Sequence, residues 1–587
     1  MPKYSKAERA SAGLGLGVGR FACASARPVE ATARGFDVTQ AIGQPVGEGE
    51  TSVAGSMTLQ TVGIVCTWLY VVYLHLGNDG LWYPGDAARH ALNGAFWGDF
   101  LASGSFHPKA FALSYYARYP AINPTSYPPL FYLLEAAAYR LFGISPFVAK
   151  GLVLGFALVA ALYAAAWLRR WVSREAGWGG TLLLLQPGVI AWSHAVLLNV
   201  PSMALGLAAL YHARRWLDRP SRDQRYLALA FIVAGFVSYF PTLIVCLAIC
   251  AWILVEWHWT KLFTRRSTAA LVTFGAVLLV ALGVVSQWAP LHVSLASTNL
   301  EQMLRVERWT YYFWESRGIV AMPTALLAAF ALVACAFDPR ARREAVPVIV
   351  WMVGCYIGLS SLTERDTRFA VILAPPVAIL GSIGFLALAR ALRLTSRVAI
   401  AVTFAALIAL HAALGWFTFV PRTEGIREAV DFLAAKAPTG MIFFEGEDNG
   451  IFTFYVRAGD PGFRRGVVRG SKLLYASAIF NRWRLQQRVS SPAEVVELLR
   501  RESGCQWLAI ETSTGVEEIE AVRFLRQALE GPEFERVQSF KVDAVRGYRV
   551  DVYRLRRPAE EPDRIALPFP VLGQGTEFKA KPIERTW

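Results

Sequence analysis

The chain has 587 residues, of which 55% are hydrophobic and 18% are charged, whereas soluble domains carry about 25% charged residues. This balance excludes an ordinary soluble protein, and a content of 13% aromatic residues suits two interfacial belts. The net charge of +15 does not indicate a nucleic-acid partner, because the arginines form short clusters between apolar runs. That pattern is typical of loops that meet anionic membrane lipids.

The first segment, residues 1–57, is rich in Gly, Ala and Ser and lacks a sustained apolar period. We expect a disordered cytoplasmic tail there. Its Gly-x-Gly stretch, Gly13–Gly19, is not interpreted as a nucleotide loop, because no strand precedes it and no helical pattern follows it.

Apolar runs of spanning length then follow one another and predict a polytopic α-helical membrane protein with about eleven transmembrane helices. They make up a predicted transmembrane domain over residues 58–420. The runs are 58–76, 147–168, 178–194, 197–213, 226–240, 242–257, 268–287, 319–337, 346–362, 369–389 and 398–420.

The basic residues between these runs predict the orientation. Five clusters, which begin at Arg169, Arg214, Lys261, Arg340 and Arg390, fall on one side if the N-terminus is cytoplasmic. We therefore expect a multi-pass protein of the plasma (inner) membrane. The opposite, outer side receives residues 77–146, 194–198, 288–318, 362–368 and everything after 420.

The first outer loop, 77–146, contains a moderately apolar stretch, Pro128–Phe142. Treating it as a span would break the alternation of the basic clusters. We interpret it as a surface helix that lies in the interface or dips partway into the membrane. Glu135, within it, is expected to be solvated or to snorkel toward water.

The region 421–587 alternates between helical and strand-like patterns, which predicts a small extracytoplasmic α/β domain. The tail after Pro558 is Pro-rich and is expected to be irregular. The expected helices are Glu424–Lys436, 492–503 and 516–529, and the expected strands are Met441–Phe444, Trp507–Ile510, Arg536–Val542 and Tyr548–Leu555.

Asp86 is the most informative residue of the outer loop. A helix that starts there has one face with polar residues and Trp97 and an opposite face with apolar residues, which suits the membrane surface. The first face holds Asp86, Arg89, His90, Asn93 and Trp97, and the second holds Ala88, Ala91, Leu92 and Ala95. A carboxylate at that boundary can act as a general base on an acceptor hydroxyl. Asp86 can equally be the N-cap of its helix, and the spacing does not separate the two roles.

The order of motifs along the chain resembles the GT-C superfamily of multi-span glycosyltransferases, above all the protein O-mannosyltransferase and aminoarabinose transferase group. The resemblance covers roughly residues 77–390. It rests on Gly85-Asp86-Ala87, Gly98-Asp99-Phe100, Tyr127-Pro128-Pro129-Leu130, Leu141-Phe142-Gly143-Ile144-Ser145, and Asp366-Thr367-Arg368-Phe369 with Pro375 and Pro376.

The resemblance implies transfer of a sugar from a polyprenyl-phosphate donor to a glycan, lipid or protein acceptor outside the cytoplasm. In that scheme Asp86 is the catalytic base of an inverting displacement. Arg368, with Arg365 beside it, neutralises the lipid phosphate.

Three positions depart from the family pattern. Ala87 follows Asp86 where Glu is common, Tyr127 precedes Pro-Pro where His or Lys is common, and Asn199 stands where relatives often carry Asp. A carboxylate pair would have favoured a metal. We therefore predict no metal site and no certain cofactor, and leave a divalent metal as an open alternative.

Further substrate-binding candidates come from the outer side. They are Arg89, His90, Tyr127 and Asn199, and, in the loop 288–318, Arg308, Trp309 and Tyr312. Aromatic residues beside charges can stack on a sugar, but they also occur in ordinary interfacial belts.

Two other functions stay open at this stage. A lipid or sugar transporter usually has inverted repeats with broken helices, and we see no such repeat in the sequence. A non-catalytic scaffold that keeps the GT-C fold is consistent with Ala87 and Asn199.

Overall fold

The structure is a computed structural model, and contacts divide it into two units, Met1–Leu59 and Gln60–Trp587. Of the first unit it describes only the beginning of a helix, so most of the predicted tail 1–57 lies outside the described residues. The described residues are 50–74, 81, 86–124, 127–256, isolated positions within 268–283, 305–315, 318–362, 365–394, 396–418, 424–480, 482–512, 519–542, 547–557, 559–560, 564–568 and 580–584.

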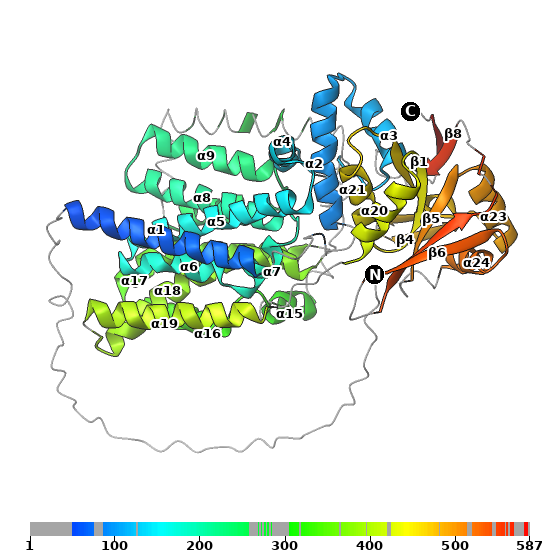
Figure 1. The fold of residues 1–587 in the computed structure, drawn as a ribbon. Coiled ribbons are helices and arrows are strands. Elements are labelled where there is room, and N and C mark those ends of the chain that lie inside the picture. The colour runs from blue at the N-terminus through cyan, green and yellow to red at the C-terminus, as the bar shows by residue number, and fades with distance from the viewer. Residues whose placement is uncertain are drawn as a thin grey trace, which may run out of the picture. The chain divides into compact units, whose positions relative to one another are not determined.

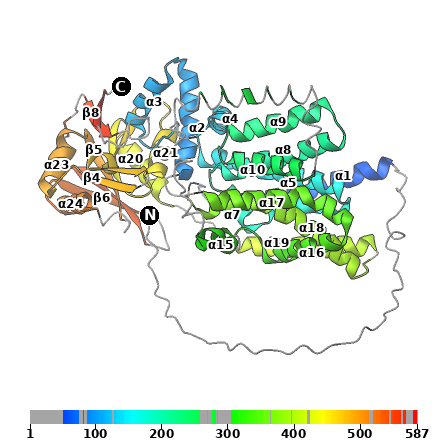
Figure 2. The same ribbon diagram turned by 180° about the vertical axis from the view of Figure 1, so that it is seen from behind.

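Long apolar helices dominate the chain up to residue 418 and run side by side (Figures 1 and 2). The helices are α1 (Glu50–Tyr73), α2 (Asp86–Ser103), α3 (Pro108–Arg118), α4 (Leu130–Phe142), α5 (Pro146–Trp171), α6 (Gly179–Leu184), α7 (Pro187–Ser193), α8 (Asn199–Asp218), α9 (Arg222–Phe236), α10 (Thr242–Val255), α15 (Val306–Glu315), α16 (Met322–Phe337), α17 (Pro339–Ser361), α18 (Ala374–Ala391) and α19 (Arg397–Trp416), with the 3-10 helices η2 (Glu175–Trp178) and η4 (Thr367–Leu373).

Four helices of the described chain are long and apolar enough to cross a membrane: α5, α17, α18 with its preceding η4, and α19. Three shorter apolar stretches lie in α1, α10 and α16. The predicted runs coincide with helices where the structure describes them, although most of run 268–287 lies outside the described residues. The count of eleven spans stays a prediction.

The predicted run 178–194 is divided, which the sequence analysis did not anticipate. Pro187 ends α6 and starts α7, because a proline inside a helix removes a hydrogen bond and clashes with the preceding turn. The Gln186 amide bridges the break: Nε2 donates to the Leu182 carbonyl at 2.7 Å and to Thr324 Oγ1 at 3.1 Å. Its Oε1 accepts from the Ala321 amide at 2.9 Å.

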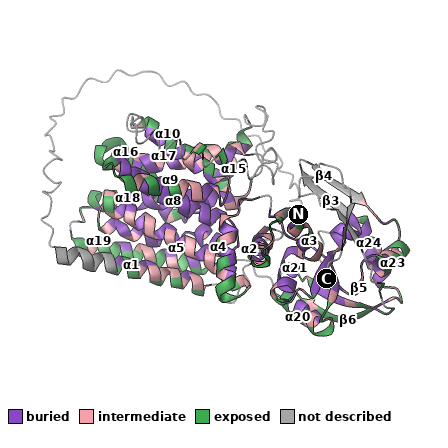
Figure 3. Cartoon of the chain, turned by 90° about the horizontal axis from the view of Figure 1, so that it is seen from above, coloured by how far each residue is buried: buried purple, intermediate pink, exposed green. Residues whose placement is uncertain are grey.

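Residues at the helix starts explain several boundaries. Ser145, Asp338 and Ser396 cap α5, α17 and α19 by accepting a hydrogen bond from a first-turn amide. The core lies around α8 and α18, whose residues are mostly buried (Figure 3). At Gly384 an added Cβ would lie 1.8 Å from the Leu327 carbonyl oxygen, so glycine permits α18 to approach α16 closely.

The surface helix predicted over Pro128–Phe142 corresponds to α4, and the structure packs it against α2. Two expectations about this pair are wrong. The polar face of α2 is not exposed, because His90 and Asn93 are buried together with the apolar face. Glu135 is not solvated: it is 0% exposed, it accepts a hydrogen bond from the Tyr139 hydroxyl at 3.2 Å, and burial raises its pKa well above the usual range.

The C-terminal region contains a five-stranded mixed sheet in the order β2-β1-β5-β7-β6. Strand β1 pairs in parallel with β2 and β5, while β7 is antiparallel to both β5 and β6. The strands are β1 (Gly440–Glu445), β2 (Arg465–Arg469), β5 (Cys505–Glu511), β6 (Phe534–Lys541) and β7 (Arg549–Leu555), and the helices are α20 (Ile426–Lys436), α21 (Asn449–Ala458), α22 (Gly470–Leu473), α23 (Pro492–Arg501) and α24 (Glu520–Leu529).

The expected α/β alternation therefore appears, with elements that the sequence did not predict. Helix α21, strand β2, helix α22 and the hairpin of β3 (Tyr475–Phe480) and β4 (Arg482–Gln487) fill the stretch between β1 and α23. The tail after Pro558 is not wholly irregular, because β8 (Arg564–Pro568) pairs with β9 (Ala580–Glu584).

Candidate active site

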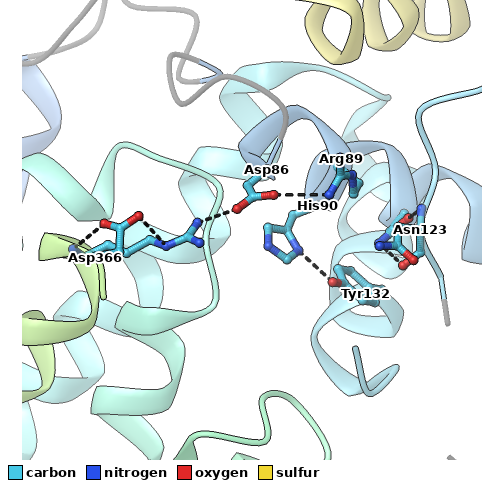
Figure 4. Close-up of polar contacts among 8 residues, drawn as sticks. Asp86, Arg89, His90, Asn123, Tyr132 and Asp366 are labelled. Carbon is cyan, nitrogen blue, oxygen red and sulfur yellow. Dashed lines mark hydrogen bonds and ion pairs between the residues drawn. The ribbon is translucent and has the colours of Figure 1, made fainter. Parts of the chain in front are cut away.

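Asp86, the first residue of α2, lies between two guanidinium groups. Arg368 Nη1 donates to Asp86 Oδ2 at 2.7 Å, and Arg89 Nη1 donates to Oδ1 at 3.2 Å (Figure 4). The side chains of Asp86 and Arg368 are 22% and 12% exposed. The ion pair joins two segments 282 residues apart in the sequence. The structure thus brings together the two residues that the resemblance marked as base and phosphate ligand.

The electrostatics of Asp86 favour its ionised form. Burial by itself would raise the pKa of this carboxyl, but the charges of Arg89 and Arg368 outweigh burial and lower its pKa below the usual value of 3.8. Asp86 is therefore an anion at neutral pH, and both of its oxygens are engaged.

Asp366 fixes the position of Arg368. It is the N-cap of η4, and its Oδ1 accepts a hydrogen bond from the Arg368 backbone amide at 3.0 Å. Its Oδ2 also lies 3.4 Å from Arg368 Nε. The guanidinium of Arg368 thus bridges two carboxylates, one on each side (Figure 4).

His90 forms part of the wall beside Asp86. Its Nδ1 shares a hydrogen bond of 2.7 Å with the Tyr132 hydroxyl, and its ring lies 4.8 Å from the Tyr127 ring, centroid to centroid. Burial lowers the pKa of His90 to about 3, against the opposing charge of Asp86. The imidazole is therefore neutral at physiological pH and is not poised to donate a proton.

Tyr127 and Asn199 belong to the same region. The Tyr127 ring lies 6.2 Å from the Tyr239 ring, and Tyr239 hydrogen-bonds the Asn199 side chain. Asn199 is the first residue of α8 and is 7% exposed. Of the predicted site residues, Asp86, Arg89, His90, Tyr127, Asn199 and Arg368 therefore lie in one neighbourhood.

The remaining candidates contact the loop that carries Asp366. Arg365 Nη1 donates to the Glu307 carbonyl at 3.2 Å, and Arg308 Nη1 donates to the Leu362 carbonyl at 3.4 Å. Tyr312 is 0% exposed on α15, and its ring lies 5.0 Å from the Tyr311 ring, centroid to centroid.

Trp309, also on α15, is 36% exposed, and its carbonyl accepts a hydrogen bond from the Tyr356 hydroxyl. These contacts join α15 to the end of α17 and to Arg365 in the segment before η4, and they do not involve Asp86.

Sequence reasoning did not assign Asp366, Tyr132 or Tyr239 a role at the site. Asp366 carried a usable signal, because an Asp two residues before Arg368 at a helix start is a typical cap. The two tyrosines had none, since aromatics are common throughout the chain. Among the described residues, no group of three or more His, Cys, Asp or Glu could hold a metal ion.

No protein-family model matches the chain, and no curated protein matches it. Solved structures are similar to the chain. ArnT from Cupriavidus metallidurans in the apo state is 16% identical, with a TM-score of 0.57, over 87% of this chain and 100% of that one. The same protein bound to undecaprenyl phosphate is 15% identical, with a TM-score of 0.54, over 86% of this chain and 99% of that one.

The fold is that of a GT-C membrane glycosyltransferase. The resemblance seen in the outer-loop motifs is thereby confirmed for the fold. The chain shares with ArnT a mostly helical fold, in which several described helices are long and apolar enough to cross a membrane and a mixed sheet lies in the C-terminal region.

Proposed function

We propose that this protein is a glycosyltransferase that moves a sugar from a polyprenyl-phosphate donor to an acceptor on the extracytoplasmic side of the inner membrane. The observation that carries the proposal is the 2.7 Å ion pair of Asp86 and Arg368 in a GT-C fold. It unites a carboxylate with a guanidinium suited to a phosphate monoester or diester. The ArnT structure with undecaprenyl phosphate supports a lipid-phosphate donor.

The chemistry divides between the two side chains. Asp86 accepts the proton of an acceptor hydroxyl, whose oxygen then attacks the anomeric carbon of the donor sugar. The bond from that carbon to the carrier phosphate breaks, and the electron pair leaves with the phosphate. Arg368 stabilises the negative charge that develops there. Attack opposite the leaving group inverts the anomeric configuration.

The ion pair also gives the free enzyme a resting state. Arg368 pairs with Asp86 in the structure, and a donor phosphate would compete for the same guanidinium. Once Arg368 turns to the phosphate, Asp86 loses a counter-charge, and its affinity for a proton rises. Donor binding would therefore both fill the site and make Asp86 a stronger base.

The first test is mass spectrometry of the lipids that copurify with the wild type and with Asp86→Asn. The variant should carry more sugar-loaded carrier, because transfer stops while Arg368 is released to bind phosphate. Asp431→Asn is the matched control, since Asp431 is 70% exposed on α20 and should leave the lipid content unchanged.

Each outcome separates the candidates. Loaded carrier enriched in Asp86→Asn supports the enzyme and identifies the sugar. Bulk phospholipid alone in both proteins would contradict the donor assignment and favour a transporter or a scaffold. Equal amounts of loaded carrier would make Asp86 a helix cap and not a base.

A further inference from the structure

Two cations of the C-terminal region lie at the end of strand β2 and on the helix α22 that follows it. Arg469, the last residue of β2, donates from Nη1 to the Pro120 carbonyl at 2.8 Å. Its Nε is buried without an acceptor in the described part of the chain. Lys472, on α22, is 7% exposed, and among the described residues its ammonium group has no hydrogen-bond or ion-pair partner.

Arg89 adds a third cation from α2. Burial is the main cause that lowers the pKa of Lys472 to about 7, and the charges of Arg469 and Arg89 add to it. Burial and the charge of Arg89 likewise lower the pKa of Arg469. Glu445 opposes Arg469, but burial raises the pKa of Glu445 to about 7, so its compensation is partial at neutral pH.

Such an arrangement is costly unless an anion completes it. A buried charge without a partner destabilises the protein, and like charges close together add to that cost. Guanidinium and ammonium groups are the usual ligands of phosphate and carboxylate. The Arg469 Nε, which has no acceptor in the described part of the chain, and the mostly buried Lys472 ammonium are therefore the kind of donors that an anionic group would satisfy.

Arg89 links these cations to Asp86, and it contacts a different carboxylate oxygen from the one that Arg368 contacts. Arg89 contacts Asp86 Oδ1, while Arg368 contacts Oδ2. A substrate whose reacting atoms lie at Asp86 can therefore contact two separate groups of cationic side chains. One group lies on η4, and the other is shared by α2 and the C-terminal region.

We propose that Arg89, Arg469 and Lys472 form a second anion subsite, which binds a phosphate or carboxylate group of a substrate positioned at Asp86. The assignment of this group to a substrate rests on the proposed function, whereas the subsite itself can be tested without turnover. In this arrangement the C-terminal region supplies ligands to the active site and is not only its cover.

The test is sulfate binding to the full-length protein in detergent, measured by isothermal titration calorimetry at constant ionic strength and pH 8. Sulfate keeps its charge at this pH, so any proton uptake comes from the protein. The wild type should bind sulfate and take up protons, because the anion raises the pKa of Lys472. Lys472→Met should bind roughly tenfold or more weakly at this site and take up fewer protons, because only Glu445 then remains to respond.

Two further variants make the result specific. Lys472→Arg keeps the charge, so it should retain sulfate binding with a smaller proton uptake than the wild type, which a merely structural role of Lys472 would not produce. Arg427→Gln removes an exposed cation of α20 and should behave as the wild type. Equal sulfate binding and equal proton uptake in Lys472→Met and the wild type would overturn the proposal.

Arg368→Met separates this subsite from the proposed donor site. If sulfate binding and its proton uptake persist in Arg368→Met, the subsite is independent and the proposal stands, whatever the lipid analysis of Asp86→Asn gives. If both are lost in Arg368→Met and kept in Lys472→Met, the only anion site is the one at Arg368, and the subsite proposal fails while the proposed function does not.

The source of the anion is decided by the copurified lipid of Lys472→Met. Less loaded carrier than in the wild type would place the anionic group on the donor sugar. An unchanged amount, together with weakened sulfate binding, would place it on the acceptor.

Discussion

At the residue scale, two arginines and not water stabilise the ionised carboxylate of Asp86. Both oxygens accept from arginines, and these charges lower its pKa although burial would raise it. In the function proposed above, the protein without its donor would therefore hold an ionised but weak base. Its strength depends on where Arg368 directs its guanidinium, which makes Arg368 a determinant of the pH profile.

We expect Arg368→Gln to shift the acid limb of the profile of kcat/KM to higher pH. Asp86 must be deprotonated to act, so activity is present above its pKa and is lost as the pH falls through it. Removing the Arg368 charge leaves burial less opposed and raises that pKa. The measurement is the initial rate as a function of pH for the wild type and the variant. The quantity compared is the pH at which the acid limb falls, and not the maximum rate. Coincident limbs would show that Arg368 does not tune Asp86.

At the element scale, the packing of α2 on α4 holds the site together. The two helices meet at Gly94, where an added Cβ would lie 2.2 Å from Glu135 Oε2 and 2.5 Å from its Cγ. His90, four residues earlier on α2, bonds Tyr132 of α4. A displacement of α4 would therefore move the wall next to Asp86.

Gly94→Ala should destabilise the protein by about 1–3 kcal/mol, because the buried Glu135 must shift to make room. Gly98→Ala is the matched control one turn later, where the added Cβ would meet Ala136 Cβ at an ordinary 3.5 Å. It should be neutral or slightly stabilising, since alanine favours helix. Thermal unfolding of both variants in detergent measures the difference, and equal midpoints would contradict this account of the packing.

The sequence predicted most of the helices well, because the helical period and the capping residues are local signals. Ser145 and Asp338 cap the helices expected after them. The burial of Glu135 was missed because its neighbours come from α2, about 40 residues earlier, and no local pattern reports them. Strand β2 was missed because arginines stand at both of its ends, Arg465 and Arg469, and leave no apolar alternation.

At the scale of the whole molecule, a buried ion pair joins the outer loop to the C-terminal region. Arg457 of α21 contacts both oxygens of Asp99 on α2, at 2.6 and 2.9 Å. The two side chains are 5% and 16% exposed, and the guanidinium also lies 4.3 Å from the centre of the Phe463 ring. The same helix, α2, thus carries Asp86 at its start and the link to the C-terminal region near its end.

Arg457→Met should destabilise the protein by about 3–5 kcal/mol, because Asp99 would remain buried without its partner. The double variant Arg457→Met, Asp99→Asn should recover part of that loss, since no charge is left unpaired. Thermal unfolding and hydrogen exchange of α21 measure both. Arg427→Gln, which breaks an exposed pair on α20, should cost less than about 1 kcal/mol, and a similar cost for Arg457→Met would show that the link is unimportant.

Sequence order and motif resemblance were enough to anticipate the fold and to place the segments of Asp86 and Arg368 on one side, but they did not predict the ion pair between the two residues. They did not anticipate Arg469 and Lys472. Gly470-Ser471-Lys472 matches no motif, and its nearness to Arg89 arises only when the C-terminal region packs against the outer loop.

The separation of 282 residues between Asp86 and Arg368 also means that the two residues are synthesised at different times. At a synthesis rate of roughly 5–20 residues per second, Asp86 leaves the ribosome about 15–60 s before its partner exists. During that interval the nascent chain contains Asp86 but lacks Arg368, with which Asp86 forms an ion pair in the folded protein. A chain that ends before η4 lacks Arg368, so it cannot form the ion pair with Asp86.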